Sequence, residues 1–276
     1  MAGASSRGRV RGGGFRRLGL GVVALAALLT VAVARPADAR TDNKTKAILF
    51  VHGYNPTSNS TDCGGDFDTM ISQLRTAGFT GTMVKVGYYS GDVNCNVNLR
   101  SWGSFGDSSS WKEIAKAFSK YIYSTYTAQG IDVDVVGYSM GGLISRGAVW
   151  GAQKAETGFS APIGVEDVVT LGTPHNGAAW YSNLCLWGQC TGLKPGSSEL
   201  NWLNQNGNPQ GKTGTEFTTI GSTGDSVVPS ASAIYMSIPT TNKVTYSGVP
   251  HTGSTNYMHN ATVVTRSGNA LAFVNQ

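Results

Sequence analysis

The sequence predicts a single-domain α/β protein with a mostly parallel sheet and helices on both faces of that sheet. Short apolar runs alternate along the chain with segments whose apolar residues recur at helical spacing. The composition, 40% hydrophobic and 13% charged, is that of a globular protein. Strands that alternate with helices form parallel sheets, because each helix crosses back to the start of the next strand. Residues 40–276 are enough for one sizeable core.

Each strand is expected where an apolar run is short and ends in turn residues. These runs span residues 46–51, 82–86, 131–136, 165–171, 217–220 and 244–246. Helices are expected over residues 66–77, 110–126 and 140–150, with a terminal helix that includes 270–274. Residues 90–110 are rich in Gly, Ser and Asn, which predicts a loop.

The first 39 residues have the pattern of a secretory signal peptide. An arginine-rich start precedes the uncharged apolar run 18–34, and Ala37-Asp38-Ala39 has the small-x-small form after which signal peptidase cleaves. A run of about 17 residues is near the lower limit for a permanent membrane anchor. We expect an extracellular protein of residues 40–276, exported by the general or the twin-arginine route.

The positive charge of the chain is concentrated in this leader. The whole sequence has a net charge of +5, and residues 1–39 carry six arginines against one aspartate. The remainder is therefore neutral, which argues against a nucleic-acid partner.

The four cysteines predict disulfides, because their number is even and the expected compartment is oxidising. Of the three possible pairings we favour Cys63 with Cys95 and Cys185 with Cys190. The first pair would tie two loops together, and only a short loop separates the second. No CxxC pair or neighbouring histidine supports a metal site.

A candidate nucleophile stands in the sequence Gly137-Tyr138-Ser139-Met140-Gly141. This GxSxG pattern lies between an expected strand and an expected helix, the context in which it forms a nucleophile elbow. Glycines flank the serine because the turn is too tight for side chains. The helix start supplies free N–H groups and partial positive charge, both suited to a developing oxyanion.

A nucleophilic serine needs a base, and only four histidines are present. His251 follows the last expected strand, where a catalytic histidine lies when the chain order is Ser, acid, His. His52 is in a turn that could place a backbone N–H toward the site. His175 follows a strand end, and His259 is expected at the surface.

The acid should then lie between Ser139 and His251. The candidates in that interval are Glu156, Glu166, Asp167, Glu199, Glu216 and Asp225. Asp225 is favoured because it follows the carboxyl end of strand 217–220, where active-site groups of open α/β sheets gather. The alternative for Asp225 is an Asx turn or a helix cap.

The ordered motifs together resemble the small secreted bacterial lipases of the class 2 lipase family. They are Phe50 to Tyr54 (FVHGY), Gly137 to Gly142 (GYSMGG), Leu171 to Gly177 (LGTPHNG), Gly224 to Pro229 (GDSVVP) and Val249 to Gly253 (VPHTG). The resemblance implies an α/β-hydrolase fold, a triad of Ser139, Asp225 and His251, and an oxyanion hole formed by the N–H groups of Tyr54 and Met140. A longer, more aromatic loop after Gly177 departs from the minimal family pattern.

The motifs predict a secreted carboxylic-ester hydrolase, a triacylglycerol lipase or esterase that works through an acyl-enzyme on Ser139. A cutinase-like polyester hydrolase is the close alternative, and a non-catalytic lipid-binding protein on a hydrolase scaffold is the alternative of another class. The chemistry needs no metal or organic cofactor. The expected partner is an ester at a lipid–water interface rather than an integral membrane, and we expect a monomer.

Overall fold

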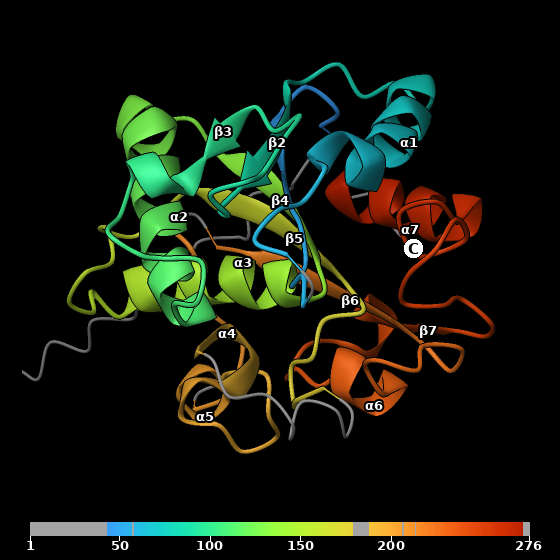
Figure 1. Cartoon of the computed structure of the whole chain (residues 1–276). Helices are drawn as coiled ribbons and strands as arrows, with labels where there is room; N and C mark the ends of the chain where they lie inside the picture. The colour runs from blue at the N-terminus through green and yellow to red at the C-terminus, as the bar shows by residue number, and fades with distance from the viewer. Residues whose placement is uncertain (1–42, 57, 179–187, 206, 213, 273–276) are drawn as a thin grey trace, which may run out of the picture. The chain divides into compact units, whose positions relative to one another are not determined.

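The computed structural model describes residues 43–56, 58–178, 188–205, 207–212 and 214–272, all within the compact unit Arg40–Gln276. The expected signal peptide, residues 1–39, lies outside the described residues. At the centre is a seven-stranded sheet in which every neighbouring pair is parallel, in the order β3-β2-β1-β4-β5-β6-β7 (Figure 1). The strands are β1 Ala47–Val51, β2 Met83–Gly87, β3 Val97–Asn98, β4 Val133–Tyr138, β5 Val165–Leu171, β6 Glu216–Ser222 and β7 Lys243–Tyr246.

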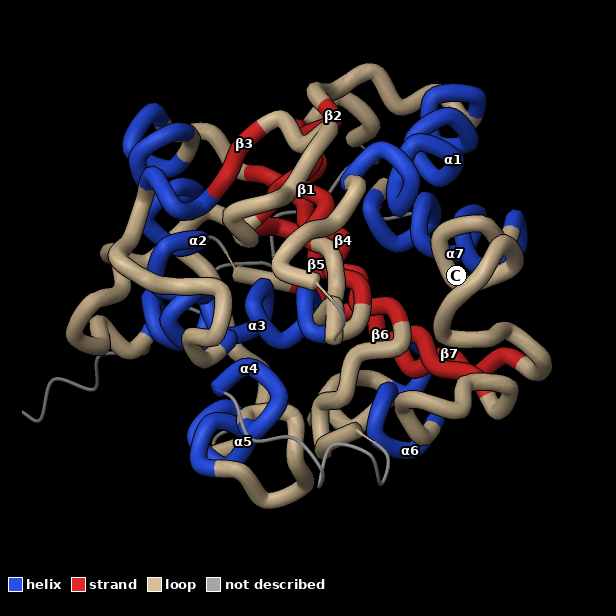
Figure 2. The backbone as a smooth tube through the Cα atoms, viewed as in Figure 1, coloured by secondary structure: helices blue, strands red, loops and turns tan. Residues whose placement is uncertain are grey.

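Helices cover both faces of this sheet, as the alternating pattern predicts (Figure 2). They are α1 Cys63–Thr76, α2 Trp111–Thr125, α3 Met140–Gln153, α4 Gly188–Thr191, α5 Ser198–Leu203, α6 Ser230–Ala233 and α7 Ala261–Leu271. Three short 3₁₀ segments, η1 Leu99–Ser101, η2 Thr127–Gln129 and η4 Thr240–Asn242, lie between them.

Two apolar cores result, one on each face. Side chains of α2 and α3, such as Trp111 and Leu143, pack on one face of the sheet. Side chains of α1 and α7, such as Phe67 and Val263, pack on the other face, where the two helices lie side by side (Figure 1). The strands of the middle are buried on both faces, which explains their continuous apolar runs.

Some element bounds differ from the sequence prediction. Helix α1 begins at Cys63 rather than residue 66, because the Asp62 side chain caps it by accepting the Gly64 N–H. The terminal helix occupies Ala261–Leu271, capped by Asn260. Ala270 and Leu271 of the expected stretch 270–274 belong to this helix, and residues 273–274 lie outside the described residues. The expected loop 90–110 contains the two-residue edge strand β3.

The disulfide predicted between Cys63 and Cys95 is confirmed. It joins the first residue of α1 to the segment before β3. Cys190 is also disulfide-bonded, and its predicted partner Cys185 lies outside the described residues.

Among the helices of the described residues, none combines the length and the apolar character that crossing a membrane requires.

Candidate active site

Ser139 lies at the sharp corner between β4 and α3. It is the N-cap residue of α3, and its backbone has φ 53° and ψ −124°, a conformation that costs a non-glycine residue about 1–3 kcal/mol. Gly141 makes the corner possible, since a Cβ at that position would lie 2.1 Å from the Val51 carbonyl oxygen at the end of β1. The tight approach of α3 to β1 therefore explains the second glycine of the GxSxG pattern.

The structure brings Ser139, His251 and Asp225 into one hydrogen-bonded chain. His251 Nε2 lies 3.0 Å from Ser139 Oγ, and His251 Nδ1 lies 2.8 Å from Asp225 Oδ2. All three residues are buried, with 6–8% of their surface exposed. The residues that the sequence order Ser, acid, His selected therefore lie together, and His251 can act as the base that takes the Ser139 proton.

Asp225 uses its two carboxylate oxygens for different partners. Oδ1 accepts the N–H groups of Val227 and Val228, each at 2.8 Å, while Oδ2 accepts from His251 and from the Tyr257 hydroxyl at 2.9 Å. Asp225 therefore forms the Asx turn that was the alternative to a role in the triad, and it also contacts His251. No motif in the sequence pointed to Tyr257.

The carboxylate of Asp225 remains ionised in this environment. Burial raises the pKa of Asp225, but the hydrogen bond and charge of His251, together with the two backbone N–H groups, outweigh burial and hold the pKa below its usual range. An ionised carboxylate at this position can stabilise a positive charge on His251.

The turn His52-Gly53-Tyr54 leaves the end of β1 and passes directly against Ser139. A Cβ on Gly53 would lie 2.9 Å from the Ser139 Cβ, so the close approach requires glycine at this position. Met140 is the first residue of α3, where backbone N–H groups have no partner within the helix. Tyr54 and Met140 therefore flank the nucleophile, as expected of residues that bind an oxyanion.

A second histidine–aspartate pair, His52 and Asp92, stabilises the turn His52-Gly53-Tyr54. His52 Nε2 lies 3.0 Å from Asp92 Oδ2, and both side chains are fully buried. His52 Nδ1 lies 2.8 Å from the Gly53 carbonyl oxygen, and the Tyr88 ring stacks on the imidazole with its hydroxyl donating to the same carbonyl at 2.6 Å. No motif in the sequence pointed to Asp92, which lies in the expected loop 90–110.

The family of the chain follows from comparison with known proteins. The sequence model described as a PGAP1-like alpha/beta domain matches residues 43–264. The chain belongs to this family. No curated protein sequence matches the chain.

Solved structures similar to the PGAP1-like domain include two lipases. Lipase B of Aspergillus fumigatus has a TM-score of 0.57 and 17% identity, over 86% of this chain and 55% of that one. The phospholipase PlaB of Legionella pneumophila has a TM-score of 0.58 and 14% identity, over 82% of this chain and 59% of that one. The chain thus spans little more than half of these relatives, and at such identity the likeness shows the fold. The α/β-hydrolase fold is confirmed, and the narrower resemblance to class 2 lipases stays a prediction.

A pocket of about 400 Å³ opens at the nucleophile of the PGAP1-like domain. Its lining includes Ser139, Tyr54, the His251 loop and the start of α1. A second hollow, of about 280 Å³, adjoins it at Tyr54 and Asn55. The hydrogen-bonded chain of Ser139 is therefore accessible to a small molecule from this pocket.

The other histidines lie outside the hydrogen-bonded chain of Ser139. His175 is buried and its Nε2 lies 3.0 Å from Thr170 Oγ1; burial, with the nearby charge of Arg146, holds the pKa of His175 well below its usual range. His259 Nδ1 contacts Asn256 Oδ1 at 2.8 Å.

Three of the other candidate acids have structural partners. Glu156 forms an ion pair with Lys112, Glu199 accepts from the Ser110 hydroxyl, and Glu216 accepts from Asn242. Each lies in contacts between elements rather than at the nucleophile.

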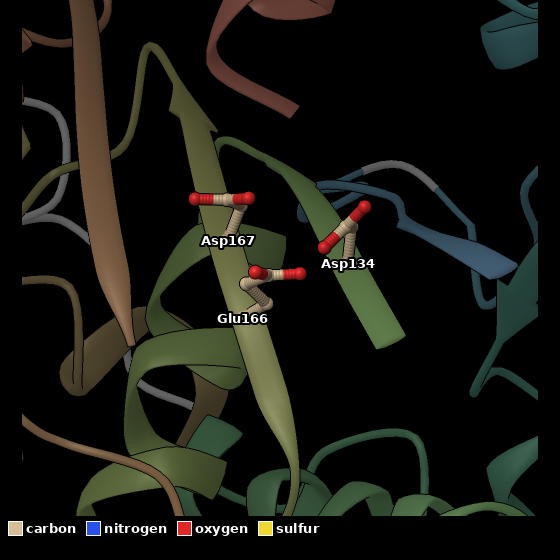
Figure 3. A group of neighbouring side chains, drawn as sticks. All are labelled: Asp134, Glu166 and Asp167. Carbon is tan, nitrogen blue, oxygen red and sulfur yellow. The ribbon is translucent and has the colours of Figure 1, made fainter. Parts of the chain in front are cut away.

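Glu166 and Asp167 gather with Asp134 near the starts of β4 and β5, at the opposite ends of the strands from Ser139 (Figure 3). Within the described part of the chain, this is the one group of acids whose oxygens lie close enough together to hold a metal ion, within 4.8 Å of one another. The Lys46 ammonium forms an ion pair with Glu166, so a positive charge of the protein itself offsets part of the negative charge of this group. We therefore interpret it as an ion-pair cluster.

Proposed function

We propose that this domain is a serine carboxylic-ester hydrolase, a secreted lipase or esterase that acts on acylglycerols. The observation that supports the proposal is the hydrogen-bonded chain from Ser139 through His251 to Asp225, mounted on a strained corner at the start of a helix. The lipase-like fold is consistent with this chemistry.

The mechanism uses each member of the chain once in each half of the reaction. His251 Nε2 takes the proton of Ser139 as its Oγ attacks the ester carbonyl, and Asp225 stabilises the imidazolium that forms. The N–H groups of Tyr54 and Met140 bind the oxyanion of the tetrahedral intermediate. His251 then returns the proton to the leaving alcohol, and water, activated by the same nitrogen, hydrolyses the acyl-enzyme.

The expected leader places this activity outside the cell, where the substrate is an ester at a lipid–water interface. The mechanism requires neither a metal nor an organic cofactor, because the serine, the histidine and the backbone N–H groups supply every step. We propose that residues 40–276 act as a monomer.

Labelling with a fluorophosphonate tests the proposal directly. We expect one covalent adduct, located on Ser139 by mass spectrometry, and no adduct on a folded Ser139→Ala variant. A folded wild-type protein that takes no label and hydrolyses no ester would be a non-catalytic lipid-binding scaffold. Hydrolysis rates on short and long acyl esters, a triacylglycerol emulsion and a polyester film separate a lipase from an esterase and from a cutinase-like enzyme.

A further inference from the structure

The pocket beside the nucleophile carries negative charge that no basic side chain balances. Besides His251, the ionisable side chains that line it are those of Tyr54, Tyr138, Asp62 and Asp66. Within the described part of the chain, no lysine or arginine lines this pocket. An incoming substrate therefore meets two carboxylates near the ester that reacts.

Of these two carboxylates, Asp66 is the one without a partner from the protein. It stands in the first turn of α1 and is half-buried. Among the described residues, none donates a hydrogen bond to its side chain, and none forms an ion pair with it. Burial raises the pKa of Asp66, and His52, Asp62, Asp92 and His259 are the charged or titratable groups that face it.

Asp62 differs in this respect. Its Oδ1 caps α1 by accepting the Gly64 N–H at 3.0 Å, and it also accepts from Asn94 Nδ2 at 2.8 Å. The hydrogen bond from Asn94 lowers the pKa of Asp62. The Asp62 carboxylate therefore already accepts hydrogen bonds that stabilise the start of α1, whereas the Asp66 carboxylate is available to a ligand.

The proposed reaction determines which part of the substrate lies next to Asp66. His251 Nε2 must give its proton to the leaving oxygen, so the alcohol portion lies on the His251 side of Ser139. The loop His251 to Asn256 and the start of α1, with Asp66, line the same pocket. We therefore place the alcohol portion, which leaves at His251, in this pocket beside Asp66.

We infer that Asp66 selects the alcohol portion of the substrate by charge, favouring a positively charged alcohol over a neutral one and disfavouring an anionic one. This inference rests on the proposed ester hydrolysis. A cation in the pocket gives the half-buried Asp66 carboxylate the partner that the protein does not supply. An anionic group, such as a phosphate next to the ester, would be repelled by both carboxylates.

Three butyrate esters with the same acyl chain test the inference. They are the choline ester, its uncharged isostere 3,3-dimethylbutyl butyrate, and the anionic 2-sulfoethyl ester. We expect kcat/KM of the wild-type enzyme to fall in that order, by about tenfold between the cationic and the neutral ester, the size of one partly screened charge at close range.

The Asp66→Asn variant keeps the shape of the side chain and removes its charge. We expect the cation-to-neutral ratio of kcat/KM to fall to within about twofold of one, while the rate on the neutral ester stays near that of the wild type. Asp68→Asn is the matched control, because Asp68 lies on the same helix, is 66% exposed and does not line the pocket. The control should keep the wild-type ratio.

The pH dependence of the same ratio gives a second readout. The proton uptake of His251 affects both esters equally and cancels, so the ratio reports the charge of the pocket. Because its pKa is raised, Asp66 is ionised and selective above that pKa, and the preference is lost as the pH falls through it. In Asp66→Asn the ratio should not respond in this way.

The outcomes separate the two proposals. An enzyme that hydrolyses the neutral ester with no preference for the choline ester, or whose preference survives in Asp66→Asn, overturns the role of Asp66 and leaves ester hydrolysis standing. A preference lost equally in Asp68→Asn would assign it to the general surface charge and also overturn the inference. Wild-type protein that hydrolyses none of the three esters contradicts the proposed function itself.

Discussion

The molecule contains two buried histidine–aspartate pairs that look alike and have different surroundings. In one, His251 Nδ1 lies 2.8 Å from Asp225; in the other, His52 Nε2 lies 3.0 Å from Asp92. Burial raises the pKa of both carboxylates. Hydrogen bonds and the charge of the histidine lower each pKa by more, so the net change is a decrease in both cases. The carboxylates therefore do not distinguish the two pairs.

The difference lies at the second nitrogen of each ring. His251 Nε2 faces the Ser139 hydroxyl, which can donate its proton. His52 Nδ1 faces the carbonyl oxygen of Gly53, which can only accept a hydrogen bond. The second nitrogen of His52 therefore faces an acceptor, and not a proton that a reaction would remove. A histidine–aspartate pair is a candidate base only when its outer nitrogen faces a proton donor.

Removing the outer contact of the first pair should have the largest effect. We expect Ser139→Ala and His251→Ala each to lower kcat on a soluble ester by about a millionfold, because the members of a catalytic triad act as a unit. The two losses should not add in the double variant. Unfolding in urea, followed by circular dichroism, verifies that the variants are folded, and a His251→Ala enzyme with near-normal kcat would remove this histidine from the mechanism.

The carboxylate of the same pair should matter somewhat less. Asp225→Asn leaves the wrong tautomer of His251 and no charge to stabilise the imidazolium, so we expect kcat to fall by about 10⁴-fold. Asp167→Asn and Glu199→Gln remove acids that do not contact His251 and should change kcat by no more than a fewfold. A folded Asp225→Asn enzyme with normal turnover would contradict the assignment of the acid.

The second pair should affect activity only through the turn that it supports. We expect His52→Ala to lower kcat by about 10²-fold, the effect of a small misplacement of the Tyr54 N–H. The free energy of unfolding should fall by about 3–5 kcal/mol, because Asp92 is left buried without its partner. His259→Ala, which removes a contact with Asn256 alone, is the control and should change neither quantity measurably. A loss of activity in His52→Ala as large as that in His251→Ala would show that the two pairs are not distinct in function.

The sequence was informative where a residue type is required by its local position. Ser139 follows from the glycines that its corner needs, and Asp225 and His251 follow from loops that leave the carboxyl ends of parallel strands. The alternation of strands and helices was sufficient for the sheet and for the faces that the helices cover.

Contacts that depend on the path of a loop could not be predicted. Asp92 reaches His52 across forty positions of sequence through a segment with no periodicity, and Tyr257 reaches Asp225 in the same way. The unpartnered state of Asp66 is likewise a property of what surrounds it, since the sequence pattern predicts only that Asp66 begins a helix. Polar partners of this kind are determined by tertiary packing rather than by local sequence.

The disulfide between Cys63 and Cys95 adds a covalent link between two segments beside Ser139 that hydrogen bonds also join. Cys63 begins the helix that carries Asp66, and Cys95 closely follows Asp92, whose carboxylate holds His52. A backbone hydrogen bond from Cys63 to Val93 runs beside the covalent link. This covalent link therefore couples the start of α1, which lines the pocket at Ser139, to the Asp92 segment, which contacts the turn His52-Gly53-Tyr54. We expect a displacement of one segment to displace the other.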